Sequence, residues 1–145
     1  MGMEFRSYFR QAQQDIQALE QENLTRALLH VRNAVIDKLS KPGAGNEYKV
    51  PGTRNRRHTA SAEGDPPAVL FGQLRSSISF EIEQLPDRFV GMVGPRGVPY
   101  ARRLEFGFVG VDAAGRRYNQ APRPYLKPTF EEKREEIKQI VGGRR

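Results

Sequence analysis

The chain has 145 residues, with 24 Lys and Arg against 17 Asp and Glu, and it contains neither Cys nor Trp. The length suits a single domain, which we expect to comprise residues 1–145. Only 37% of the residues are apolar, so the core is expected to be complete in one part of the chain and thin elsewhere. The absence of cysteine excludes a disulfide scaffold, a Cys-ligated metal site and a thiol nucleophile.

Hydropathy argues against a membrane protein. The longest apolar run, residues 68–71, is far shorter than the roughly 18 residues that a spanning helix needs. Residues 1–8 lack the apolar segment of a signal peptide. We therefore expect no membrane partner, and a reducing, soluble compartment or a particle assembled there.

The net charge of +7 is concentrated in two stretches. Residues 49–57 hold four basic residues and no acid, and residues 96–127 hold seven basic residues and two acids, a net charge of 7 − 2 = +5. Such clusters favour an acidic partner, which can be nucleic acid, a membrane face or a protein surface. The alternative is that these arginines are solvated loop charges.

Residues 1–40 are predicted to form a long helix. Five apolar residues recur at helical spacing and make one stripe: Leu24, Leu28, Val31, Val35 and Leu39. The Gln- and Glu-rich part upstream is expected to continue the helix with a thinner buried edge at Ile16 and Leu19, so residues 1–23 form a helical extension. Residues 42–45 contain Pro and Gly and end the helix.

Residues 41–70 are predicted to form an extended arm, because Gly and Pro interrupt every periodic pattern. Residues 47–50 are at most a short strand. A connection of this length is unusual in a compact domain, so we expect it to be functional or to become ordered on binding.

The second half of the chain predicts a small antiparallel sheet and two further helices. Residues 77–83 alternate strictly between apolar and polar side chains, and residues 89–93 return as the second strand of a hairpin. Residues 99–106 read as a short helix with Gly107 at its C-cap, and residues 107–119 as a further strand or hairpin. Residues 125–141 form the closing helix. The predicted fold class is α+β, with the helices packed on one face of the sheet.

Catalytic signals are weak. His58 is followed by Glu63 and Asp65, a set that can ligate a metal or act as base and orienting group, but a flexible loop holds such groups poorly. His30 is interpreted as a structural or surface residue. Residues 94–97 lack the ending of a phosphate loop, and Ser76, Ser77 and Ser79 lack a nucleophile-elbow pattern. We expect no enzyme, no cofactor and no metal, with a metal-dependent hydrolase as the third alternative.

Three passages, in this order, resemble motifs of one family of phage proteins. Residues 58–78 resemble its "Pro-Gly-x-Pro-Pro, then Gly-x-Leu-x-x-Ser-Ile" passage, and residues 99–107 its "Tyr-Ala-x-x-x-Glu-Phe-Gly" signature. Residues 122–128, followed by a charged helix, resemble its "Pro-x-Arg-Pro-Phe-Leu-x-Pro-Ala" ending. The family is that of the neck or tail-completion proteins of lambdoid-type, long-tailed phages. Asp65 and Tyr125 depart from its usual residues without altering the chemistry.

The resemblance covers about residues 24–141 and implies a non-enzymatic virion protein. Such a protein forms a ring in the neck, between the head connector or stopper and the tail terminator or tail tube. The resemblance implies a hexamer first and a dodecamer second, assembled in the host cytoplasm. The alternative function is a stand-alone basic nucleic-acid-binding domain, since residues 53–58 carry enough charge to follow a phosphate backbone. The sequence holds no recognised RNA-binding motif and no helix-turn-helix pattern.

In the ring, the basic turns face either DNA in the lumen or acidic grooves of adjoining rings, and both alternatives stay open. Phe106 packs either against a neighbour or inside its own domain. The expected interface residues are Arg54, Arg56, Arg57, Arg102, Arg103, Phe106, Gly107, Arg116, Arg117 and Arg123.

Overall fold

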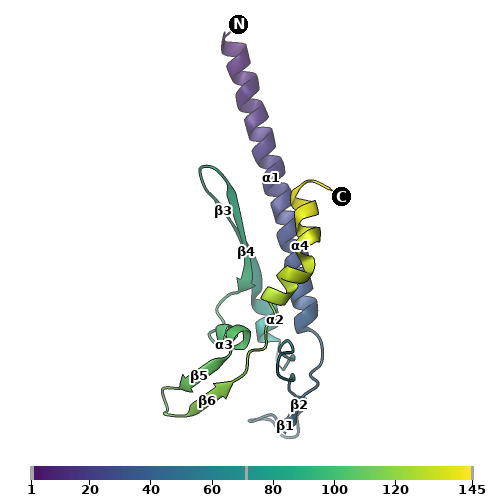
Figure 1. The fold of residues 1–145 in the computed structure, drawn as a ribbon, viewed down its shortest axis with the longest axis vertical. Helices are drawn as coiled ribbons and strands as arrows, with labels where there is room; N and C mark the ends of the chain where they lie inside the picture. Colours follow the sequence, from purple (N-terminus) through teal and green to yellow (C-terminus); the bar gives the residue numbers. More distant parts are fainter. Residues whose placement is uncertain (1, 71, 145) are drawn as a thin grey trace.

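The computed structural model describes the backbone of residues 2–70 and 72–144, and side chains from Tyr8 onward within those ranges. The molecule is elongated and built along one helix, α1 (Gly2–Leu39), whose N-terminus forms one end (Figure 1). The fold is α+β, as predicted. The described strands form three separate two-stranded antiparallel sheets, β1–β2, β3–β4 and β5–β6.

The remaining elements follow α1 in a simple order. Their bounds are β1 (Glu47–Lys49), β2 (Arg57–Thr59), α2 (Gln73–Ser77), β3 (Ile78–Gln84), β4 (Phe89–Pro95), α3 (Ala101–Phe106), β5 (Phe108–Val111), β6 (Arg117–Gln120) and α4 (Lys127–Val141). The arm predicted for residues 41–70 therefore contains a hairpin, β1–β2, rather than one short strand. The backbone N–H of Gly45 donates to the Ala60 carbonyl at 2.7 Å and extends this pairing.

The two halves of α1 differ in what they contact. The apolar stripe of the second half is buried as predicted, with Val31, Val35 and Leu39 at most 2% exposed. Residues 8–22 of the first half are exposed throughout. The expected buried edge there is wrong, because Ile16 and Leu19 are each 57% exposed and no described element reaches this part of the helix (Figure 1).

The hairpin β3–β4 packs along the second half of α1. Its register pairs Ile78 with Pro95 and Phe80 with Val93, so these side chains share the face that contains the buried Ile78. On the same face, Gly91 lies so close to α1 that a Cβ atom there would come within 2.8 Å of a Leu28 methyl group. The predicted alternation of this strand is therefore confirmed.

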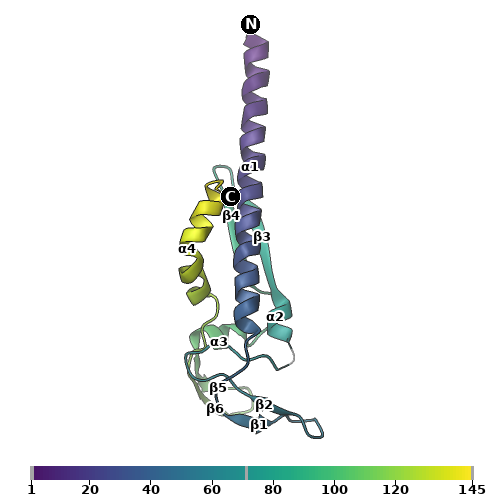
Figure 2. The same cartoon turned by 90° about the vertical axis from the view of Figure 1, so that its right-hand side faces the viewer.

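Helix α4 packs on α1, which lies between α4 and the hairpin (Figures 1 and 2). The prediction that the helices share one face of a single sheet is wrong in this detail. The hairpin β3–β4 has two strands and is wide enough for only one helix to pack on its face, so α4 packs on α1 instead. The Lys38 ammonium donates to the Glu132 carboxylate at 2.6 Å, and His30 pairs with Glu136. These pairs link α1 to α4 across their exposed edge.

Candidate interaction surfaces

Helix α3 and the start of α4 are joined by one buried carboxylate. Glu105 is 7% exposed. Its Oε2 accepts the backbone N–H groups of Tyr125 at 2.8 Å and Leu126 at 3.0 Å, and its Oε1 accepts that of Lys127 at 2.9 Å. Helix α4 has no capping side chain of its own, so Glu105 satisfies N–H groups at its first turn and places negative charge there.

Tyr125 occupies the centre of the core. It is fully buried and lies in one cluster with Val35, Leu39 and Ile78. Burial, and then the negative charge of Glu105, raise the pKa of the Tyr125 hydroxyl well above its usual value. Residues 99–107 and 122–128, two of the passages that carry the resemblance, therefore form one structural unit.

Gly107 belongs to the same unit. Its backbone has φ 74° and ψ 175°, a conformation available in practice only to glycine. A Cβ atom there would also lie 2.7 Å from the Gln120 carbonyl oxygen. This residue, expected at an interface, thus has an internal role that accounts for its type.

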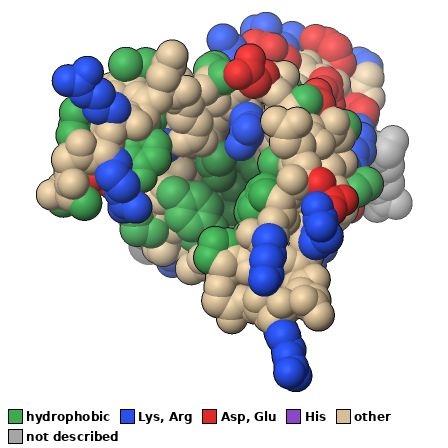
Figure 3. Space-filling model, turned by 90° about the horizontal axis from the view of Figure 1, so that it is seen from below, with side chains coloured by type: hydrophobic (Ala, Val, Ile, Leu, Met, Phe, Trp, Pro, Cys, Tyr) green, Lys and Arg blue, Asp and Glu red, His purple; other side chains and the backbone are tan. Residues whose placement is uncertain are grey.

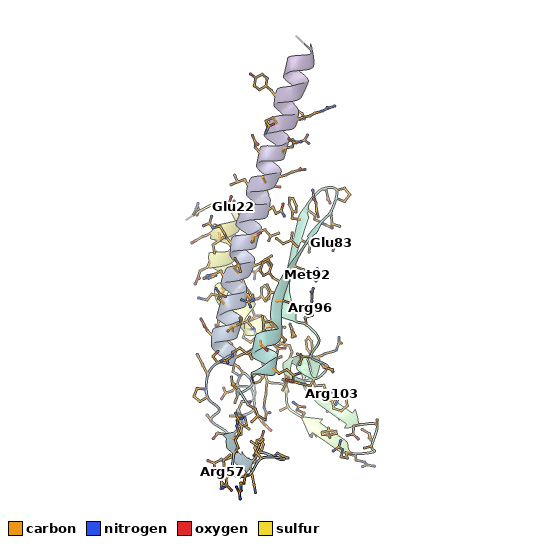
Figure 4. All side chains as sticks on the ribbon, turned by 180° about the vertical axis from the view of Figure 1, so that it is seen from behind. Glu22, Arg57, Glu83, Met92, Arg96 and Arg103 are labelled. Carbon is orange, nitrogen blue, oxygen red and sulfur yellow. The ribbon has the colours of Figure 1, made fainter. Side chains whose placement is uncertain are left out.

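The arginines expected at the interface gather at one end of the molecule. The arm, α3, the β5–β6 hairpin and the segment before α4 all lie opposite the N-terminus (Figure 1). Figure 3 views this end and shows Lys and Arg side chains around a hollow that contains hydrophobic side chains. Figure 4 labels Arg57 and Arg103 among them. The gathered residues are Arg54, Arg56, Arg57, Arg102, Arg103, Arg116, Arg117 and Arg123.

Several of these arginines also have partners within the chain. Arg102 lies over the Phe106 ring, 5.6 Å from its centroid, and Arg103 lies over the Phe108 ring at 4.0 Å. The Arg56 guanidinium donates to the Leu70 carbonyl at 2.7 Å, and Arg57 pairs with Glu47. These four arginines thus have an aromatic ring, a backbone carbonyl or a carboxylate as a partner within the chain.

The β5–β6 turn is organised by Asp112. Its carboxylate accepts the backbone N–H of Arg116 at 2.9 Å and the Arg116 Nε–H at 2.7 Å. The backbone bond from Arg116 is the main cause that lowers the pKa of Asp112. The adjacent Arg117 side chain stays exposed on β6.

A pocket of about 380 Å³ lies at the same end. Leu39, Leu74 and Leu104 contribute apolar walls, and Arg75 and Arg123 add cationic ones. The Arg123 Nε atom is buried and has no hydrogen-bond partner among the described residues. Much of the pocket lining comes from residues 58–78, the first passage of the resemblance, although Phe71 lies outside the described residues.

The candidate catalytic set stays dispersed. His58 packs edge-on against Tyr48, with ring centroids 5.5 Å apart, while Glu63 and Asp65 are exposed. Among the described residues, no group of three or more His, Asp or Glu side chains is placed to hold a metal ion.

Exposed apolar side chains mark two surfaces, and of their residues only Phe106 was expected at an interface. At the basic end, Phe106 is 71% exposed, Val109 79% and Val111 57%; the alternative that Phe106 fills its own core is therefore wrong. On the first half of α1, Phe9 is 61% exposed and lies in the same row as Ile16 and Leu19. The sequence signal for this second surface is the helical spacing of these apolar residues. The same spacing is found in a buried stripe, so it does not show that the row is exposed.

The outer face of the β3–β4 hairpin is mixed in character. Glu83, Met92 and Arg96 point away from α1 (Figure 4), and Arg96 pairs with Glu81 across the strands. This face therefore combines acidic, basic and apolar groups without a dominant charge.

Within the ranges that the structure covers, no helix has the length and hydropathy to cross a bilayer. Comparisons of the chain with protein-family models, with curated proteins and with solved structures give no match.

Proposed function

We propose that the chain is a structural subunit of a phage neck, and that it forms a homo-oligomeric ring between the head connector and the tail. It acts by docking to sister copies and to adjoining rings, and it catalyses no reaction. The observation that carries this proposal is the large surface that the single chain leaves open to solvent.

The accessible surface of the chain is 10,919 Å² for a mass of 16.5 kDa. A compact monomer of this mass exposes about 7,600 Å². The excess, about 3,300 Å², is enough for two interfaces of about 1,600 Å² per subunit, within the range of obligate oligomers. A ring subunit needs two such interfaces, one toward each neighbour.

The resemblance of three ordered passages to neck proteins supports the phage assignment. By that resemblance a hexamer is the first expectation and a dodecamer the second, located in the virion neck. The partners are then the connector or stopper on one side and the tail terminator or tube on the other, with DNA in the lumen as a further contact. The arginines at the basic end suit either DNA or acidic protein grooves.

Light scattering coupled to size-exclusion chromatography, together with negative-stain images, tests the proposal. Closed rings in the purified chain, and tailless filled heads when the gene is deleted from a phage that encodes it, are the expected results. A chain that remains monomeric alone and with the connector would overturn the proposal.

The second candidate is a stand-alone nucleic-acid-binding domain, and the gathering of eight arginines at one end favours it. It predicts binding to duplex DNA by the monomer, with an affinity that falls steeply as salt rises. Fluorescence anisotropy with labelled DNA at several salt concentrations distinguishes it from the ring, which needs no DNA to form.

A further inference from the structure

The first half of α1 carries an apolar row that nothing within the described chain covers. We name it the α1 stripe: Phe9, Ala12, Ile16 and Leu19. At 3.6 residues per turn these positions fall within about 80° of the helix circumference. The three larger side chains are 57–61% exposed. A row with this spacing is typical of a helix face that packs against another element.

The same helix face is already a packing surface further along. Ala27, His30 and Lys38 continue the α1 stripe at helical spacing, and α4 packs on that part of α1, with His30 and Lys38 paired to its glutamates. The covering helix ends at Val141, and Gly143 follows it beside Asn23. The α1 stripe is thus the uncovered continuation of an occupied interface.

Carboxylates border the α1 stripe. By helical position, Asp15 and Glu22 lie along one edge and Glu20 along the other, whereas Arg10 lies on the far side of the helix. Residues 8–22 carry three acids and one base, a net charge of 1 − 3 = −2, in a chain whose total is +7. An occupant of the stripe should therefore be apolar with a basic border.

The opposite end of the molecule offers such a surface. Val109 and Val111 share one face of β5, and their cross-strand partners on that face are Asn119 and Arg117. Both valines are exposed, as is Phe106, which stands under the Arg102 guanidinium. We name this surface the β5 face: Val109 and Val111 on β5 with Arg117 across from Val111, together with Phe106 and Arg102 at the adjoining end of α3.

We propose that the α1 stripe of one copy packs on the β5 face of a second copy of this chain. The two surfaces lie at opposite ends of the molecule, so they cannot meet within one chain (Figure 1). Pairing of two α1 stripes would bring acidic borders together, whereas stripe and β5 face have opposite charges. The contact joins two different surfaces, so it propagates from copy to copy and forms a closed ring where the rotation between successive copies closes.

This inference rests on the proposed function and deepens it, because it names the two surfaces through which sister copies dock. Each copy uses one stripe and one β5 face, so both apolar regions become covered in every subunit of a closed ring.

Mixing two variants of the full chain tests the contact. Ile16→Asp with Leu19→Asp destroys the stripe, and Val109→Asp with Val111→Asp destroys the β5 face. Each variant alone is expected to be monomeric by light scattering. Mixed in equal amounts, they retain one intact stripe and one intact β5 face between them, so they should form a dimer that contains one copy of each.

Controls separate this contact from misfolding and from other assemblies. Met92→Asp makes a similar change on the outer face of the hairpin and should leave the wild-type oligomer intact. Circular dichroism and thermal unfolding establish that each variant is folded. Should the β5-face substitutions perturb the hairpin itself, Glu20→Arg and Arg117→Glu provide a second pair: each should weaken assembly, and the two changes together should restore it.

The outcomes distinguish the contact from the function. Rings that form normally from either double variant would overturn the contact and leave the neck proposal standing. A heterodimer from the mixed variants, with wild-type chains that grow only as open filaments, would support the contact and count against a neck ring. Wild-type chains that stay monomeric at every concentration would overturn the contact.

Discussion

The carboxylate of Glu105 in α3 accepts the backbone N–H of Tyr125 at 2.8 Å, across 20 residues of sequence that include the whole β5–β6 hairpin. Leu126 and Lys127 donate to the same carboxylate. One side chain therefore fixes where α4 begins and ties the basic end of the molecule to its core.

Replacement of Glu105 by alanine should destabilise the fold, because three backbone N–H groups then lose their acceptor in a buried setting. We expect a loss of about 2–3 kcal/mol in the free energy of unfolding, measured by urea denaturation. Glu105→Gln keeps the shape and one acceptor oxygen, and should cost less. Glu131→Ala, an exposed change near the start of the same helix, is the control and should stay within about 0.5 kcal/mol. Equal effects at the two glutamates would contradict the capping role.

Burial of Tyr125 predicts a loss of stability at alkaline pH. Its pKa is raised above the usual 10.0, mainly by burial and then by Glu105, so above that pH the unfolded state loses a proton that the folded state retains. The free energy of unfolding should therefore fall as pH rises through about 10 and beyond. Tyr125→Phe removes this contribution and should flatten the alkaline limb of the profile.

Urea unfolding of both proteins from about pH 8 to about pH 11 measures this difference. At neutral pH the two should agree within about 1 kcal/mol, because the Tyr125 hydroxyl makes only a 3.5 Å contact with the Ala101 carbonyl. Parallel alkaline profiles would refute the prediction.

Local periodicity made most of the elements predictable. The second half of α1 and the strand β3 have apolar residues at spacings of 3.6 and 2, and the structure confirms both. Such patterns identify a face that packs but do not name its partner. The sequence therefore left open that α4 lies on α1. It predicted a buried edge at Ile16 and Leu19, which no described element covers.

Contacts between segments far apart in the sequence could not be predicted from the periodicity of apolar residues. Glu105 resembled any surface glutamate of a short amphipathic helix, since its three donors come 20 to 22 residues later. The arginines were found from their local density alone. Their common location depends on how α3, the arm and the β5–β6 hairpin fold back to the same end of the molecule. No local sequence pattern predicts this arrangement.

Acid should weaken the contact between α1 and α4. The hydrogen bond from Lys38 is the main cause that lowers the pKa of Glu132 in the folded state, below the ordinary 4.5. A lowered folded pKa contributes stability above the unfolded value, and this contribution is lost as pH falls through the folded value. Glu132→Gln should therefore reduce the dependence of unfolding free energy on pH below about 5.

Urea denaturation of the wild type and of Glu132→Gln from neutral to acidic pH provides the measurement. Glu131→Gln serves as the matched control, because within the described part of the chain Glu131 makes one ion pair, a 4.0 Å contact with Lys127. The effect should be small, because both carboxylates are exposed and solvent screens the pair. An unchanged acid limb in Glu132→Gln, or an equal change in the control, would count against the pairing.

Substitution of Gly107 distinguishes a role inside the fold from a role at an interface. Alanine there must adopt φ 74° with ψ 175° and place its Cβ atom 2.7 Å from the Gln120 carbonyl oxygen, so we expect Gly107→Ala to cost about 3 kcal/mol or more. Gly97 also has a positive φ, 70°, but no atom lies within 4 Å of an added Cβ, so Gly97→Ala should cost only about 1–2 kcal/mol. Thermal unfolding of the two variants gives the difference directly. If Gly107→Ala kept the wild-type stability and lost only assembly, the residue would belong to the interface, and the close approach of β6 to the end of α3 would not explain its identity.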